Sequence, residues 1–270
     1  MAELLPISTP HCTVEQDGQV VIVTMNRPAA RNALSSDMLV GLADAWAYIS
    51  STPSVRVGIL TGADGVFCAG ADLKAMGAPS EDPRVQQRAQ EIPNFHWKGL
   101  LRDGQPAKPL IAAVEGYAVA GGTELLLGTD LRVAGASATL GLFEAKRGLF
   151  PMGGSAIRLP RQIPYVHAMD ILLTGRSVTA QEALTYGLIN KVVPDGSALK
   201  VARELADEVA ASAPLSTQAI LRAYRETVHL SEEEALKVSD VIGWPVIGSE
   251  DAKEGSRAFK EKRPAVYHGK

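Results

Sequence analysis

The segment AVAGGTELLLGTD, residues 118–130, places two glycines directly before a short apolar run with Glu124 near its start. The run has the composition of a helix, and the segment DLRVAGA at 130–136 has that of a buried strand. A chain that passes from strand to helix and back to strand is typical of α/β proteins. The segment therefore predicts a strand, a helix with Glu124 in its first turn, and a second strand.

Segments on either side repeat this alternation of strands and helices. The pair Asp17-Gly18 predicts the turn of a hairpin, and the apolar spacing in 37–50 predicts a helix. Further strands are expected at 55–62, 109–119 and 187–194. Residues 75–108 are expected to form a long irregular connection. Beyond about residue 155 the sequence indicates mainly helices.

The composition is that of a globular enzyme, with 46% hydrophobic and 21% charged residues in a chain of 270. A formal net charge of -3 gives no broad attraction for nucleic acids or anionic membranes, and no apolar run reaches the roughly 20 residues that span a bilayer. The two cysteines are too few for a disulfide framework, and the five histidines lack the spacing of metal ligands. We therefore expect a cytoplasmic protein without a metal site and without nucleic-acid or membrane partners.

Two loops rich in small residues each follow a predicted strand. At the start of the helix in 118–130 the amides lack intrahelical partners, so the N–H of Gly121 is a candidate donor to an oxyanion. The segment FCAGADLK at 67–74 places Ala69, Gly70 and Ala71 after the strand at 55–62, which leaves the backbone similarly accessible. Two such loops can direct two amides at one carbonyl oxygen. Each loop taken alone also fits an ordinary strand-to-helix turn.

A second carboxylate, Glu144, lies among the apolar residues of TLGLFEAKRGLFPMGG at 139–154. Apolar neighbours desolvate a carboxylate and raise its pKa toward values that suit acid–base catalysis. The alternative is an exposed Glu144 that pairs with Lys146 or Arg147.

Four motifs together resemble the enoyl-CoA hydratase/isomerase, or crotonase, superfamily: NRPAARNAL at 26–34, GVFCAGADL at 65–73, AAVEGYAVAGGTELLLGTDLRVA at 112–134 and FEAKRGLFP at 143–151. They occur in the order and roughly the spacing of that superfamily. The resemblance implies a spiral α/β core of repeated strand-strand-helix units over residues 1–195, which holds the acyl-CoA site. It also implies a helical C-terminal region over 196–270 that serves trimerisation and covers CoA, and homotrimers that usually pair into hexamers.

The resemblance also assigns roles to residues. The backbone amides of Ala71 and Gly121 would hold the thioester oxygen of an acyl-CoA, with Glu124 as the base that activates water and Glu144 as the acid. Residues expected to contact CoA are Arg27, Arg31, Ala69, Asp72, Leu73, Phe259 and Lys262, with Lys262 drawn from this or a neighbouring subunit. Residues expected to shape the acyl pocket are Phe95, Trp97, Phe143 and Met152.

The activity implied is the reversible syn addition of water across the 2,3 double bond of a 2-enoyl-CoA thioester. CoA is part of the substrate, so no separate cofactor is expected. Alternatives on the same scaffold are an enoyl-CoA isomerase and a carnitinyl-CoA-type dehydratase, and an alternative of another class is a non-catalytic acyl-CoA-binding protein. Phe143 and Met152 depart from the usual pattern of the superfamily around Glu144, which leaves the acyl chain and the physiological direction open.

Overall fold

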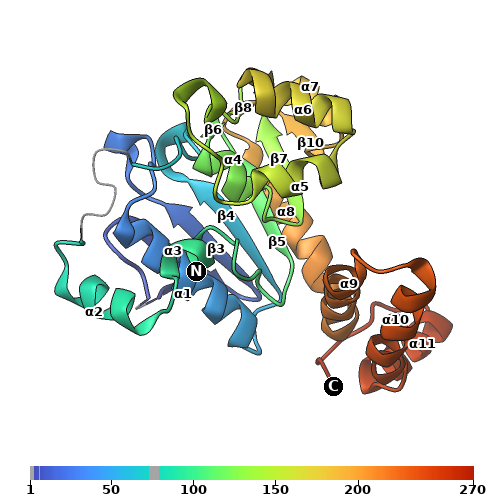
Figure 1. Cartoon of the computed structure of the whole chain (residues 1–270). Helices are drawn as coiled ribbons and strands as arrows, with labels where there is room; N and C mark the ends of the chain where they lie inside the picture. The colour runs from blue at the N-terminus through green and yellow to red at the C-terminus, as the bar shows by residue number, and fades with distance from the viewer. Residues whose placement is uncertain (1–2, 6, 73–78) are drawn as a thin grey trace.

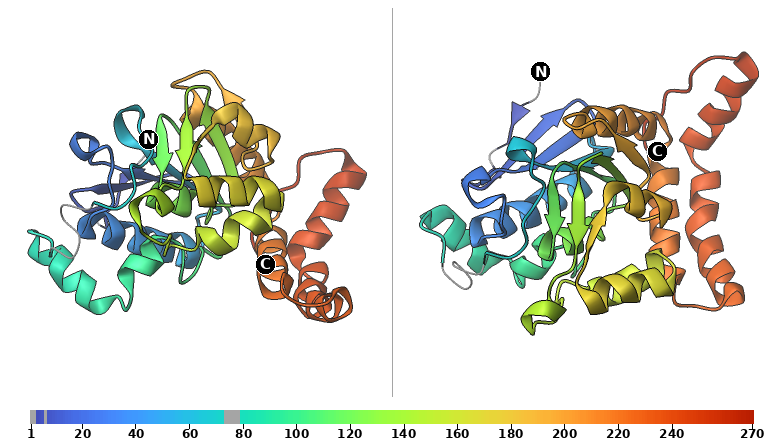
Figure 2. Two further views of the ribbon diagram at one scale, coloured as in Figure 1. Left: turned by 45° about the horizontal axis from the view of Figure 1, so that its top comes forward. Right: turned by 90° about the horizontal axis from the view of Figure 1, so that it is seen from above.

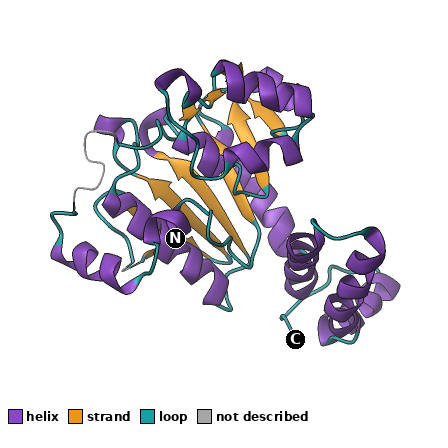
Figure 3. Cartoon of the chain, in the orientation of Figure 1, coloured by secondary structure: helices purple, strands orange, loops and turns teal. Residues whose placement is uncertain are grey.

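The computed structural model describes residues 3–5, 7–72 and 79–270 and contains two β-sheets with helices around them (Figure 1, Figure 3). The strands are β1 (Glu3–Leu4), β2 (Cys12–Asp17), β3 (Val20–Met25), β4 (Val57–Gly62), β5 (Leu110–Val114), β6 (Tyr117–Val119), β7 (Leu131–Gly135), β8 (Thr139–Gly141), β9 (Ser177–Thr179) and β10 (Lys191–Val193). The helices are α1 (Ser36–Ser51), α2 (Pro83–Glu91), α3 (Phe95–Gly99), α4 (Gly121–Leu126), α5 (Ser155–Gln162), α6 (Tyr165–Thr174), α7 (Ala180–Thr185), α8 (Ala198–Ala211), α9 (Pro214–Thr227), α10 (Glu232–Ile247) and α11 (Glu250–Glu261). Short 3-10 helices lie at Pro28–Ala30, Ala63–Gly65 and Ala145–Arg147.

After β5 the chain passes back and forth between the two sheets, which gives it a spiral course. The larger sheet has the order β1-β2-β3-β4-β5-β7-β10, and the smaller sheet has the order β6-β8-β9. From β3 to β10 the neighbours in the larger sheet are parallel, as expected where helices connect the strands. This arrangement confirms the prediction of a spiral α/β core with a helical C-terminal part.

The strand expected over 109–119 is two strands in different sheets. Between β5 and β6 the chain turns at Gly116, which has a φ of 57°. A Cβ at this position would also lie 2.5 Å from the carbonyl oxygen of Gly65. Both constraints require glycine, and the turn sends β6 into the smaller sheet, where it leads into α4.

Helices α1 and α8 cover opposite faces of the larger sheet, because alternate residues of each strand face opposite sides. On one face, Val21 and Val23 of β3 belong to the core that includes α1. On the other, Val57 and Ile59 of β4 pack with the alanines of α8. Those alanines, Ala198, Ala202, Ala206 and Ala210, recur every four residues and are all buried. Small side chains in one stripe let the helix lie close to the sheet.

Residues 79–108 contain the helices α2 and α3, so the irregular connection expected there is wrong for this part of the chain. Asp82 caps α2 by accepting a hydrogen bond from the Arg84 N–H, and Pro83 occupies the first helical position. The sequence of α2 is mostly polar and has no clear apolar stripe, because Val85 is the one residue of this helix that is buried in the described structure. The Trp46 side chain donates to the Gly99 carbonyl oxygen at 3.0 Å and joins α3 to α1.

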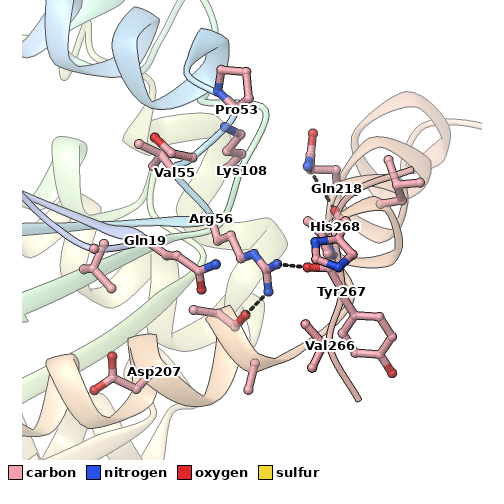
Figure 4. Close-up of a pocket in the computed structure, with 18 of the residues that line it drawn as sticks. Gln19, Pro53, Val55, Arg56, Lys108, Asp207, Gln218, Val266, Tyr267 and His268 are labelled. Atoms are coloured by element: carbon pink, nitrogen blue, oxygen red, sulfur yellow. Dashed lines mark hydrogen bonds between the residues drawn. The ribbon is translucent and has the colours of Figure 1, made fainter. Parts of the chain in front are cut away.

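Helices α9, α10 and α11 lie to one side of the two sheets in every view (Figures 1 and 2). Helix α8, which belongs to the expected C-terminal region, packs on the larger sheet. The expected domain boundary between residues 195 and 196 stays a prediction. The C-terminal tail returns toward the core along a cavity of 1010 Å³, where Arg56 donates to the carbonyl oxygens of Ala210 and Tyr267 (Figure 4). Within the described ranges, no helix is both long and apolar enough to cross a membrane.

Candidate active site

The amides of Ala71 and Gly121 lie beside each other where the segment 68–72 meets the start of α4. This segment pairs with β6, since the Cys68 N–H donates to the Tyr117 carbonyl oxygen at 2.7 Å. A Cβ on Gly121 would lie 3.5 Å from the Ala71 nitrogen. Neither amide donates to an acceptor in the part of the chain that the structure describes, and Gly121 is the first residue of its helix. The two loops therefore present two available N–H groups side by side.

This approach depends on two residues without side chains. A Cβ on Gly122 would lie 2.4 Å from the Cys68 carbonyl oxygen, so only glycine fits between the helix and the segment 68–72. Gly70 has a φ of 91°, and a Cβ there would lie 3.0 Å from the Val119 carbonyl oxygen. Glycine at both positions lets the two backbones meet.

Glu124 lies in the first turn of α4 and is only 5% exposed. Its Oε1 accepts hydrogen bonds from the Ser155 hydroxyl at 3.0 Å and from the Ser155 amide at 3.3 Å. Burial raises the pKa of the Glu124 carboxyl above its ordinary value, while the Ser155 donors act in the opposite direction because they stabilise the ionised form. Glu124 is therefore a desolvated carboxylate with dedicated donors.

Glu144, at the start of the 3-10 helix Ala145–Arg147, is 9% exposed, and its Oε2 is buried without a hydrogen-bond partner among the described residues. Burial raises the pKa of the Glu144 carboxyl, and the negative charge of Glu124 raises it further. The alternative of an exposed Glu144 paired with Lys146 or Arg147 is wrong, because Glu144 is buried and forms no ion pair with either residue in the described structure. The two carboxyl groups thus interact electrostatically but have different surroundings.

The residues near the N-terminus that are expected to contact CoA lie in the loop at 26–34 and in the segment 68–72 that carries the Ala71 amide. Arg27 forms an ion pair with Asp72 at 2.5 Å, and the Ala69 N–H donates to the Arg31 carbonyl oxygen at 3.0 Å. The Arg31 side chain is exposed. These contacts hold the loop at 26–34 against the segment that carries Ala71, while Leu73 lies outside the described residues.

Phe259 and Lys262 lie elsewhere in the same chain. Phe259 belongs to α11 and is 87% exposed, and Lys262 is the residue at which that helix ends. Figures 1 and 2 place α11 at the far end of the C-terminal helices, away from the sheets that carry the amides. Within one chain the structure does not bring these two residues to the other site residues.

The four residues expected in the acyl pocket do not share one set of contacts. Arg102 connects two of them, because its guanidinium stacks 4.3 Å from the Trp97 ring centroid and donates to the Met152 carbonyl oxygen at 2.8 Å. Phe143 is half-buried, with Arg147 5.9 Å from its ring centroid. Phe95 packs against a small cluster that includes Val40 of α1 and Val85 of α2.

A sequence model described as enoyl-CoA hydratase/isomerase matches residues 15–270. The chain belongs to the enoyl-CoA hydratase/isomerase family. It is 55% identical over 263 residues to the enoyl-CoA hydratase EchA19 of Mycobacterium tuberculosis, covering 97% of this chain and 98% of that protein. It is 37% identical to the (E)-benzylidenesuccinyl-CoA hydratase of Thauera aromatica, covering 95% and 98%. The crystal structure of the enoyl-CoA hydratase EchA1 from Mycobacterium marinum superimposes with a TM-score of 0.89 at 41% identity, covering 97% of this chain and 100% of that one.

Two residues that contact Glu124 in this enoyl-CoA hydratase/isomerase family member were not predicted from the sequence. Ser155 donates two hydrogen bonds to it, and a Cβ on Gly153 would lie 2.6 Å from its Oε2. The available signal was the pair Gly153-Gly154 directly before α5, which is similar to the pair Gly121-Gly122 that begins α4. In the described ranges, no group of three or more His, Cys, Asp or Glu side chains is placed to hold a metal ion.

Proposed function

We propose that the protein catalyses the reversible syn addition of water across the 2,3 double bond of a 2-enoyl-CoA thioester. The observation that carries this proposal is the pair of available amides, Ala71 and Gly121, with the buried Glu124 in the first turn of the same helix as Gly121 and the buried Glu144 in the field of Glu124. The 55% identity to a protein named enoyl-CoA hydratase over nearly the whole chain supports it.

The two amides are proposed to stabilise the enolate that forms when water attacks the β-carbon. Negative charge then collects on the thioester oxygen, and preorganised N–H donors lower the energy of that charge. Removing one donor of this kind typically costs about 3 kcal/mol of activation free energy. The rigid contacts of Gly70 and Gly122 support this role, because they hold the donors in place before the substrate arrives.

Glu124 is proposed to act as the base and Glu144 as the acid. A base must be ionised before it takes a proton from water, and the Ser155 donors favour ionised Glu124. An acid must carry a proton, and Glu144 has an unpartnered buried Oε2 and lies in the field of Glu124. The different surroundings of the two groups favour this division of roles, although the pair titrates as a coupled unit.

The remaining parts of the proposal concern CoA, the acyl group and the assembly. Arg27, Arg31, Ala69, Asp72 and Leu73 are proposed to contact CoA, and the wall around Trp97, Phe143 and Met152 to receive the acyl chain. Because Phe259 and Lys262 lie away from the site of their own chain, we propose that they reach CoA in a neighbouring subunit of a homotrimer, itself paired into a hexamer. We expect a cytoplasmic enzyme that needs no cofactor besides the CoA of its substrate.

The test is an assay with crotonyl-CoA and with longer or branched 2-enoyl-CoA thioesters, followed by the loss of absorbance of the conjugated thioester. Hydration of at least one of them is expected, and both Glu124→Gln and Glu144→Gln should abolish it. If the protein is instead an isomerase, its double-bond isomerisation should remain substantial in Glu124→Gln and be lost in Glu144→Gln. A non-catalytic binding protein would show thioester binding by calorimetry and no product, which would overturn the proposal.

A further inference from the structure

Ser155 is the first residue of α5 and is fully buried directly against Glu124. The preceding Gly154 has a φ of 109°, a conformation that favours glycine, and it turns the chain so that the helix begins at the carboxylate. Both donors of Ser155, the amide and the hydroxyl, reach the same oxygen, Oε1, at 3.3 and 3.0 Å. The positive end of the helix dipole points in the same direction.

The other oxygen of Glu124 has different surroundings. No side chain of the described residues donates to Oε2, and the Cα of Gly153 packs so close that an added Cβ would lie 2.6 Å from it. Ser155 therefore holds one oxygen of the carboxylate by hydrogen bonds, and the Gly153 backbone packs against the other. The backbone amides of Gly153 and Gly154 also stabilise the ionised carboxylate. In Glu144, by contrast, the buried Oε2 has no hydrogen-bond partner among the described residues.

We propose that Ser155 is a positioning residue: by holding Oε1, it orients the Glu124 carboxylate to take a proton from the attacking water. This inference rests on the proposed hydration and concerns how its base is oriented. The hydroxyl of Ser155 stabilises the ionised carboxylate and so opposes the rise in the pKa of Glu124 that burial causes. Without the hydroxyl, the carboxylate gains freedom to rotate and binds a proton more tightly.

The Ser155→Ala variant tests the contribution of the hydroxyl. Hydrogen bonds to charged groups are strong enough that kcat/KM for crotonyl-CoA should fall by about 10-fold or more at neutral pH. The acidic limb of the pH profile of kcat/KM should move to higher pH, because the ionised form of Glu124 has lost a donor. The fall should appear mainly in kcat, since CoA contacts are unchanged.

Two variants of Ser155 with equal added volume distinguish the effect of the hydroxyl from the effect of side-chain packing. Ser155→Thr and Ser155→Val both add side-chain volume at this buried position, but only threonine keeps the hydroxyl. We expect Ser155→Thr to keep the acidic limb of the wild-type profile and Ser155→Val to show the displaced limb of Ser155→Ala. Equal profiles for threonine and valine variants would overturn the proposal and show that Ser155 serves packing alone.

A titration of Glu124 without substrate tests the role of Ser155 independently of the hydration reaction. Carboxyl carbon NMR of protein labelled at glutamate, assigned with Glu124→Gln, reports the protonation of Glu124 directly. Ser155→Ala should raise the pKa of Glu124 relative to wild type, whether or not any enoyl-CoA is hydrated. An unchanged titration would reject the role of Ser155 even if the wild-type enzyme is an active hydratase.

Discussion

Gly153 leaves no room for a side chain beside Glu124, because a Cβ there would lie 2.8 Å from the carboxyl carbon. The Gly153→Ala change is therefore expected to displace the carboxylate, and displacement of a catalytic group by about 1 Å can cost about 100-fold in rate. We expect kcat for hydration to fall by about 10- to 100-fold with little change in KM. The control is Gly243→Ala in α10, where a Cβ meets no atom within 4 Å. Equal kinetics for the two variants would contradict the placement of the carboxylate.

The Glu144 carboxyl group is predicted to lower the stability of the folded protein at neutral pH. Because burial raises its pKa, the folded state binds the proton more tightly than the unfolded state, and stability falls as pH rises from the ordinary pKa of Glu, about 4.3, to the raised value. Glu144→Gln cannot ionise, so its free energy of unfolding should exceed that of wild type near pH 8. Urea denaturation should show this difference shrinking toward about pH 4, below the ordinary pKa. A variant less stable than wild type at both pH values would contradict the prediction.

Among the site residues, those that belong to one sequence motif could be predicted. Those that contact each other only in the folded structure could not. Gly121 and Glu124 belong to one segment whose glycines and carboxylate indicate a helix start. Ser155 contacts Glu124 although the two residues are 31 positions apart in the chain. Neither segment has a sequence pattern that indicates which helix start lies against which carboxylate. Hydrogen bonds of this kind depend on the packing of whole elements, so the structure was needed to identify them.

Helix α8 is expected to tolerate no larger residue on the face that meets the sheet. Ala206 is fully buried against the strands of the larger sheet, so Ala206→Leu must displace close-packed neighbours. Such overpacking typically costs 1–3 kcal/mol of stability, which is about the loss expected in the free energy of unfolding by urea. Lys200→Leu brings the same side chain to an exposed position of the same helix and should change stability by less than about 0.5 kcal/mol. Equal losses for both variants would contradict the close packing of α8.

Elements with strong periodic patterns were predicted, while those defined by turns or by weak patterns were not. Helix α1 has an apolar stripe and a serine cap, and the structure confirms it, with Ser35 accepting from the Met38 N–H. The division of 109–119 into β5 and β6 depends on one left-handed glycine, Gly116, inside a continuous apolar run. Helix α2 was missed because it is mostly polar and packs through few residues.

The C-terminal helices expose apolar side chains that a single chain leaves uncovered. Ile220 and Tyr224 of α9 are exposed, and so is Val228, which follows the last residue of that helix. On α10, Val241, Trp244 and Ile247 are exposed as well, and Trp244 is 68% exposed. Clusters of this kind on a chain are typical of surfaces that bind another protein. They support the proposed trimer, in which Phe259 and Lys262 reach CoA in a neighbouring subunit.

A charge at Trp244 is therefore expected to disrupt both the assembly and the activity. Burying a new carboxylate without a partner is costly, so Trp244→Glu should shift the mass measured by light scattering from a trimer or hexamer toward a monomer. Hydration should fall with it, chiefly through a higher KM, because Phe259 and Lys262 of the neighbouring subunit would no longer contact CoA. Lys200→Glu places the same charge on an exposed position of α8 and should leave both the mass and KM unchanged. A wild-type protein that is monomeric yet fully active would contradict the proposed assembly, and would require each chain to bind CoA without the residues of α11.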